Sequence, residues 1–302
     1  MPYLHILRAF VNGAFDDGVP RFHGITTKRL GSPRGNVFWK RDIVVKCCYR
    51  KSCEETAPAN ERMENERQHR ITANVQSVRQ RIAQSALKSG RTSNDVRLIA
   101  VTKYTEIGDG MVETFVAAGC CDLGESRPQR LLEKAEHCAT VPGFAPIRWH
   151  LIGALQRNKV RKILPVAALI HSLDSLRLAE AIDRIADEEQ LPPIHCLLEV
   201  ALSQDTEKQG IPPEQVLKTL DEMGAYRNIV VDGLMGMAGL ESDEPQIHRE
   251  FELLRKTAES ALERKLSPNV PLAELSMGMS DDFEIAIEEG ATLVRIGSIL
   301  YH

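Results

Sequence analysis

Apolar residues recur along this chain in two different patterns from about residue 60 onward. In the first, between Asn60 and Gly90, they are spaced three to five positions apart on a charged background, at Ile71, Val75, Val78, Ile82 and Leu87. This spacing predicts an amphipathic helix of about 25 residues that ends at Gly90. Beyond Gly90, short apolar runs alternate with helical patterns almost to the last residue.

The second pattern predicts eight strands separated by helices over about 210 residues. We expect strands at residues 96–103, 121–125, 147–155, 168–173, 194–202, 229–237, 275–279 and 293–300. We expect helices at 111–118, 128–138, 175–190, 212–226, 245–265 and 281–289, and a basic helix from about residue 156. Such alternation implies a parallel sheet with right-handed crossovers, and eight units favour a closed (β/α)8 TIM barrel. No Gly-x-Gly-x-x-Gly motif follows the first strand, which counts against a dinucleotide-binding fold.

Residues 1–60 differ from the rest of the chain. They are rich in Gly, Pro and Arg, and their apolar residues recur with neither the strand period of 2 nor the helical period of 3.6. We expect a poorly ordered N-terminal extension over 1–60 and a single barrel domain with its leading helix over 61–302. A targeting role is the weaker interpretation, because acidic residues interrupt the basic segment. The printed sequence ends after the last predicted strand, so we expect the helix at 61–88 to cover the place of an eighth helix.

Charge and cysteine content restrict the class of protein. The net charge of −4 combines ten Lys and Arg against five Asp and Glu in residues 1–60 with 28 against 37 in the remainder. An acidic body argues against nucleic acid as a partner, and no apolar run is long enough to span a membrane. The seven cysteines are scattered without metal-ligand spacing, which favours reduced thiols in the cytoplasm and no metal site.

The first predicted strand ends on a lysine. Side chains alternate along a strand, so Ile99, Val101 and Lys103 share one face. If that face lines the barrel, the amine of Lys103 lies at the mouth of an apolar well. Loss of hydration there would lower the pKa of the amine and make it a nucleophile toward aldehydes. The simpler interpretation is a lysine that marks where the strand reaches water.

Phosphate commonly binds after strands seven and eight of such barrels. Ser280 follows the seventh predicted strand, and its hydroxyl could contact an anion or cap the next helix. Gly297 and Ser298 belong to the eighth, and their amides could hold phosphate oxygens. Arg295 shares the inward face with Leu293 and therefore needs a buried acceptor.

Two further candidates belong to the motifs around the second and third predicted strands. Ser126 follows Gly124-Glu125, and His150 follows Trp149. His150 is either an acid–base group or a core histidine whose nitrogens are already paired. Asn158 and Lys159 could meet an anion, although a solvated helix start explains them as well.

These motifs, in this order, resemble the pyridoxal phosphate homeostasis protein family, relatives of the alanine racemase amino-terminal domain. The stretches that carry the resemblance are Leu98–Lys103, Gly124-Glu125, Trp149–Lys159, Gly233–Met235, Ser276–Asp282 and Val294–Gly297. The resemblance runs from about residue 65 to the end and implies a barrel of PLP fold type III.

The resemblance also implies roles for residues. Lys103 would form the aldimine with pyridoxal 5′-phosphate (PLP), and Arg295 would face the pyridine nitrogen. Ser280, Gly297 and Ser298 would hold the phosphate. Ser126 and His150 complete the predicted set of cofactor-binding residues, although the family usually has Asn where this chain has Ser126.

The leading functional hypothesis is a cytoplasmic PLP-binding protein of vitamin B6 homeostasis. It would be a monomer or weak dimer, with PLP-dependent apoenzymes as recipients. An arginine at the ring nitrogen disfavours protonation of that nitrogen, so we expect no efficient catalysis, at most weak racemase-type activity. The alternatives are a PLP-dependent amino-acid racemase-like enzyme and a cofactor-free Schiff-base aldolase.

Overall fold

The computed structural model describes residues 59–141, 146–203 and 210–302. The predicted extension, residues 1–60, lies outside this part of the chain except for its last two residues, which already belong to a helix. Across the described ranges, no helix combines the length and apolar character that a membrane span requires.

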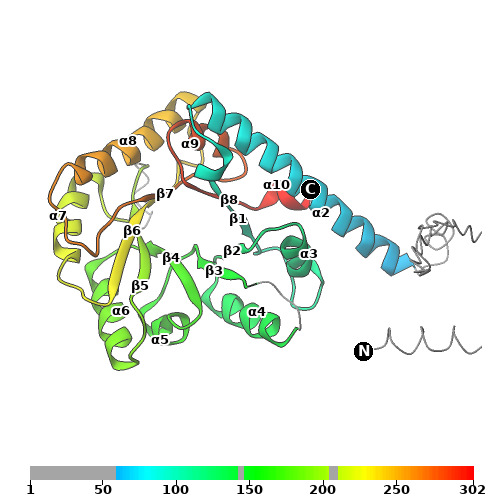
Figure 1. Ribbon diagram of the computed structural model, residues 1–302, viewed down its shortest axis with the longest axis horizontal. Helices are drawn as coiled ribbons and strands as arrows, with labels where there is room; N and C mark the ends of the chain where they lie inside the picture. The colour runs from blue at the N-terminus through cyan, green and yellow to red at the C-terminus, as the bar shows by residue number, and fades with distance from the viewer. Residues whose placement is uncertain (1–58, 142–145, 204–209) are drawn as a thin grey trace, which may run out of the picture. The chain divides into compact units, whose positions relative to one another are not determined.

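Eight parallel strands close into a barrel in which each strand pairs with the next along the chain and β8 pairs with β1. The strands are β1 Arg97–Val101, β2 Asp122–Glu125, β3 Arg148–Leu151, β4 Ala167–Leu173, β5 Ile194–Val200, β6 Ile229–Gly236, β7 Glu274–Ser276 and β8 Leu293–Ile296. Figure 1 shows the helices arranged around these strands. The predicted (β/α)8 architecture is confirmed.

The helices follow the predicted alternation. They are α2 Ala59–Lys88, α3 Met111–Ala117, α4 Pro128–Thr140, α5 Val160–Ile163, α6 Leu176–Glu188, α7 Pro213–Met223, α8 Glu244–Leu262, α9 Phe283–Glu288 and α10 Ser298–Tyr301, with short 3₁₀ turns at Ser93–Asp95 and Arg157–Lys159. The basic helix expected from residue 156 is therefore a 3₁₀ turn followed by the single turn of α5.

Several strands end earlier than predicted, and glycines explain the two largest differences, those of β8 and β3. β8 ends at Ile296 rather than Leu300, because the Gly297 amide donates to a side chain and the next residues turn into α10. β3 ends at Leu151 rather than Leu155. A Cβ at Gly153 would lie 2.2 Å from the backbone oxygen of Ser126, so only glycine permits the chain to pass there.

The core has two layers. Inside the barrel, inward-facing side chains of five strands form a small cluster, Ile99, Leu169, Leu197, Met235 and Leu293. A much larger cluster fills the space between the strands and the surrounding helices. Ile99 thus faces inward as predicted, and the alternation places Val101 on the same face.

Helix α2 packs against α3, α9 and α10, on the side of the barrel where the short helix α10 follows β8 (Figure 1). Its buried stripe is Ile71, Val75, Val78, Ile82 and Ala86. Leu87 was expected in this stripe but is 70% exposed, because a spacing of four from Ile82 selects Ala86 instead. Arg81 joins α2 to α9 through two bonds to Glu284, of 2.9 and 2.7 Å.

Tyr301 connects the end of the described chain to the end of β1. Its hydroxyl donates to the carbonyl of Val101 at 2.8 Å, and its ring meets Phe115 and Tyr104 edge-on, with centroids 5.5 and 5.3 Å away. Burial of this phenol raises its pKa, so it remains a donor throughout the physiological range.

We expect Tyr301→Phe to lower the free energy of unfolding by about 1 kcal/mol, since the ring packing remains and one buried hydrogen bond is lost. Urea unfolding of the two proteins measures this difference. No change would mean that the carbonyl of Val101 is satisfied without the hydroxyl.

Candidate functional site

Lys103 lies at the carboxyl-end rim of the barrel, in a turn just beyond β1. Its side chain is exposed, and its Nζ lies 4.9 Å from the centroid of the Tyr104 ring. The structure therefore places Lys103 at the end of the barrel where the sequence predicts it, with an exposed side chain instead of the expected burial. β1 ends at Val101, two residues earlier than expected, so Lys103 lies in the turn beyond the strand and not on it.

Ser280 and Gly297 meet at the same rim. The Gly297 amide donates to the Ser280 hydroxyl oxygen at 3.2 Å, and Ser280 is only 7% exposed. A Cβ at Gly297 would lie 3.5 Å from Cβ of Val101 and 3.8 Å from Cε2 of Tyr104, so this backbone faces the end of β1. Because β7, β8 and β1 are neighbours, the barrel brings Lys103, Ser280 and Gly297 to one side.

Two polar groups follow from this turn. Asp282 occupies the N-cap position of α9, but its carboxylate accepts from the Met279 amide at 2.5 Å and makes no bond to an amide of the helix. Ser280 is therefore not the N-cap residue, and its hydroxyl accepts from Gly297. Ser298 is half-buried and begins α10, where the first amides have no acceptor inside the helix. The donor set at this corner suits an anion.

Arg295 occupies the barrel interior below this corner and is 4% exposed. It donates to the hydroxyl oxygen of Ser276 at 2.6 Å and to the carbonyl of Gly236 at 3.0 Å, which supplies the acceptors that its burial requires. Burial lowers the pKa of the guanidinium to about 10, with Asp282 and Glu199 opposing the shift. Arg295 therefore remains a cation at neutral pH.

A continuous chain of hydrogen bonds crosses the interior from Arg295 to β2. We name it the interior polar chain, and it consists of Asp122, His150, His171, Ser276 and Arg295. Asp122 Oδ1 lies 2.9 Å from Nε2 of His150, and Nδ1 of His150 lies 3.0 Å from Nε2 of His171. Nδ1 of His171 lies 2.9 Å from the hydroxyl of Ser276.

The protons of this chain can be assigned from its two ends. Burial raises the pKa of Asp122, but hydrogen bonds from His150 and Arg148 outweigh burial and lower it to about 2, so this carboxylate only accepts. Burial lowers the pKa of His150 and of His171, so both rings are neutral. Each histidine then donates through Nε2, and the Ser276 hydroxyl donates to His171 while it accepts from Arg295. Both nitrogens of His150 already have hydrogen-bond partners. His150 is therefore linked to Arg295 only indirectly, through His171 and Ser276.

The neutral histidines predict acid sensitivity. The pKa of His171 is lower in the folded chain than in the unfolded chain, so its contribution to stability is complete above pH ~6.5 and is lost as the pH falls, by up to about 1.4 kcal/mol per pH unit. We expect His171→Gln to flatten the fall in unfolding free energy between pH 7.5 and 5.5. Urea titrations at both pH values measure the difference between the two proteins, and equal slopes would contradict the assignment of a neutral His171.

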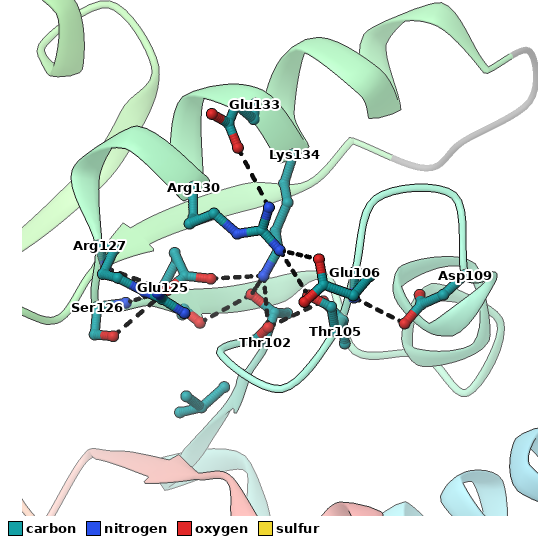
Figure 2. Close-up of polar contacts among 12 residues, drawn as sticks. Thr102, Thr105, Glu106, Asp109, Glu125, Ser126, Arg127, Arg130, Glu133 and Lys134 are labelled. Carbon is teal, nitrogen blue, oxygen red and sulfur yellow. Dashed lines mark hydrogen bonds and ion pairs between the residues drawn. The ribbon is translucent and has the colours of Figure 1, made fainter.

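Residues that sequence reasoning missed lie behind the rim, between β2 and α4 (Figure 2). Lys134 is 2% exposed and pairs with Glu125, which is fully buried, at 2.6 Å. Lys134 also donates to the carbonyl of Thr102 at 2.5 Å. A signal existed in the sequence, because Lys134 interrupts the apolar stripe that Leu131 and Cys138 define on α4.

The remaining predicted residue, Ser126, adjoins this pair at the end of β2. Its amide and hydroxyl donate to Glu125 Oε1 at 2.8 and 3.4 Å, and the side chain is half-buried. On the opposite wall, Glu199 of β5 is 6% exposed, and burial together with Asp174 raises its pKa to about 7 against the effect of Arg295. Glu199 was also missed, although it shares the inward parity of Leu197 on β5.

These groups fit a small anionic aldehyde. Lys103 offers an accessible amine, the corner of Ser280, Gly297 and Ser298 offers donors to an anion, and Arg295 offers a buried cation. No cluster of His, Cys, Asp and Glu in the described ranges has the geometry to hold a metal ion.

Comparison with known proteins gives a consistent result. The family described as alanine racemase, N-terminal domain, matches residues 67–302. The pyridoxal phosphate homeostasis protein of Synechocystis is 39% identical over 206 residues, which cover 68% of this chain and 90% of that protein. The pyridoxal phosphate homeostasis protein of Pseudomonas aeruginosa is 36% identical over 233 residues, which cover 76% of this chain and 94% of that protein.

Solved structures share the barrel. The structure of PipY from Synechococcus elongatus with PLP bound superposes with a TM-score of 0.63 at 32% identity, covering 74% of this chain and 100% of that one. An unknown protein from Bifidobacterium adolescentis superposes with a TM-score of 0.72 at 37% identity, covering 78% of this chain and 96% of that one. Alanine racemase of Clostridium difficile, at 14% identity and a TM-score of 0.57, shares the fold.

Proposed function

Because this chain belongs to the alanine racemase N-terminal domain family, and within it to the pyridoxal phosphate homeostasis proteins, we propose that it binds PLP and serves intracellular vitamin B6 homeostasis. The observation that carries the proposal is the meeting of an exposed lysine and a serine–glycine anion corner at the ends of three neighbouring strands. PLP supplies an aldehyde and a phosphate, which are the two groups that this rim can receive.

Each rim residue then has a role. Lys103 would hold PLP through its amine, which is the nucleophile that an aldehyde ligand requires. Ser280, Gly297 and Ser298 bind the phosphate through a hydroxyl and backbone amides. Ser126 and His150 complete the predicted set, with Ser126 next to the rim and His150 acting through the interior polar chain.

Arg295 favours a carrier over an efficient enzyme. Its guanidinium is held by Ser276 and Gly236, and it cannot act as an acceptor. Facing the pyridine nitrogen, it would oppose protonation of that nitrogen, and an unprotonated ring stabilises a carbanion poorly. We therefore expect weak chemistry at the α-carbon of amino acids.

The exposure of Lys103 also supports transfer of PLP to other proteins. An amine in solution or on another protein could reach a ligand that is attached to this side chain. We propose PLP-dependent apoenzymes as recipients and a monomer or weak dimer as the working state. The scattered cysteines support a reducing compartment, the cytoplasm, as its location.

Titration of the purified protein with PLP tests the proposed function. We expect an absorption band near 420 nm that saturates at one equivalent, and deuterium washout from alanine no faster than free PLP produces. Washout at rates typical of an enzyme would favour the racemase-like alternative. A protein that gives no band but forms a borohydride-stable adduct with a phosphorylated sugar would favour the aldolase.

A further inference from the structure

The Lys134–Glu125 pair requires an explanation beyond folding. Lysine is rarely this buried unless it is paired, and a buried ion pair generally adds no stability over apolar residues of the same volume. Its contacts are specific: one Glu125 oxygen accepts from Lys134, while the other accepts from the Ser126 and Arg127 amides at 2.8 and 3.1 Å. The pair therefore fixes the chain where it leaves β2 (Figure 2).

The third contact of the pair points to Lys103. The carbonyl of Thr102 accepts from Lys134 Nζ at 2.5 Å, and this carbonyl belongs to the peptide bond that precedes Lys103. The same oxygen accepts from the amide of Thr105 at 3.0 Å and from its hydroxyl at 2.9 Å. Thr102 to Thr105 therefore form a turn, with Lys103 at one of its two central positions.

This turn is what places Lys103, because the β1 ladder ends before it. Val101 is the last residue of β1, and the next bonds to β2 are those of Thr102, whose amide and hydroxyl donate to the Gly124 carbonyl at 2.8 and 3.2 Å. Both Thr102 and Thr105 are fully buried. Lys134 thus holds, from behind the rim, the one carbonyl on which the turn depends.

We propose that Lys134, neutralised by Glu125, is a positioning residue for Lys103, a role that rests on the proposed function. It fixes the carbonyl of Thr102 and hence the backbone of the turn, so that the Lys103 amine meets the aldehyde of a ligand anchored by its phosphate at Ser280 and Gly297. A displacement of about 1 Å in a reacting group can slow a reaction by roughly a hundredfold, so the clamp acts on rate more than on ligand affinity.

The test uses the full chain and the double variant Lys134→Met/Glu125→Gln, which leaves no lone buried charge. Stopped-flow absorbance at 420 nm measures the rate of covalent attachment of PLP. Calorimetry with 4-deoxypyridoxine 5′-phosphate, which lacks the aldehyde, measures non-covalent binding at the same site. Hydrogen exchange at the Thr105 amide reports on the turn without any ligand. The matched control is Lys218→Met/Glu222→Gln, an exposed pair on α7.

We expect attachment to slow by about tenfold or more in the double variant, with affinity for the deoxy analogue within about twofold and faster exchange at Thr105. The control should match the wild type in all three measurements. An unchanged attachment rate would overturn the role of Lys134, and so would an equal loss of rate and of analogue affinity, because that pattern indicates general disruption.

Two further outcomes are distinguishable. If the wild type itself does not attach PLP, the proposed function fails and this role fails with it. If the double variant does not fold, the variant Lys134→Arg replaces it in the test. Arginine keeps the positive charge but places its N–H donors differently from Lys134 Nζ relative to the Thr102 carbonyl, so we expect slower attachment in this variant as well. A wild-type rate in Lys134→Arg, with unchanged exchange at Thr105, would overturn the proposal.

Discussion

Lys103→Ala is expected to abolish covalent attachment of PLP while leaving the protein folded. The side chain is exposed at the rim, so its removal takes no apolar contact from the core. The phosphate corner at Ser280 and Gly297 is untouched, so non-covalent affinity should fall far less than attachment does. Absorbance near 420 nm with saturating PLP, together with the melting temperature, measures both effects.

The matched control is Lys159→Ala, a half-buried lysine after β3 that could compete as the attachment site. It should retain the absorption band of the wild type. Full attachment in Lys103→Ala together with loss of attachment in Lys159→Ala would transfer the role to Lys159.

Lys134→Met alone is expected to have the largest effect on stability. It leaves the carboxylate of Glu125 fully buried without its counter-charge, which costs about 3 to 5 kcal/mol of unfolding free energy. Total stability of a domain is about 5 to 15 kcal/mol, so this loss is a large fraction. The double variant Lys134→Met/Glu125→Gln should recover most of it, because no buried charge remains.

Urea unfolding of the two single variants and the double variant measures the coupling between Lys134 and Glu125. The exposed pair of Lys218 and Glu222 is the control, and its loss should change stability by less than about 1 kcal/mol. Additive effects of the two buried substitutions would contradict a direct ion pair.

The barrel and the position of Lys103 could be predicted because both depend on local periodicity. Alternating strands and helices define a parallel barrel, and the carboxyl end of β1 then places Lys103 at the rim. The exposure of Lys103 could not be predicted in this way, because it depends on β1 ending at Val101, with the chain then turning at Thr102. The predicted end of β8 was wrong for a similar reason, because the amide of Gly297 donates to the Ser280 side chain and not to a neighbouring strand.

The polar contacts inside the barrel and behind its rim join residues that are far apart in the sequence. The periodicity of apolar residues carries no information about such pairs. Ser276 and His171 bond across the interior although 105 residues separate them, and only the closed barrel brings β4 and β7 within reach. The alternation of side chains along each strand already indicated that Ser276 and His171 face inward, and the spacing on α4 placed Lys134 among apolar residues. Partners for these groups became evident only from the geometry.

Borohydride trapping with peptide mapping tests the central claim most directly. Reduction of the PLP-loaded wild type converts the covalent bond into a stable secondary amine, and proteolysis with mass spectrometry locates it. We expect one pyridoxyl phosphate group per chain, on the peptide that contains Lys103. A label distributed over several surface lysines, or one found on a single peptide without Lys103, would contradict the site described above.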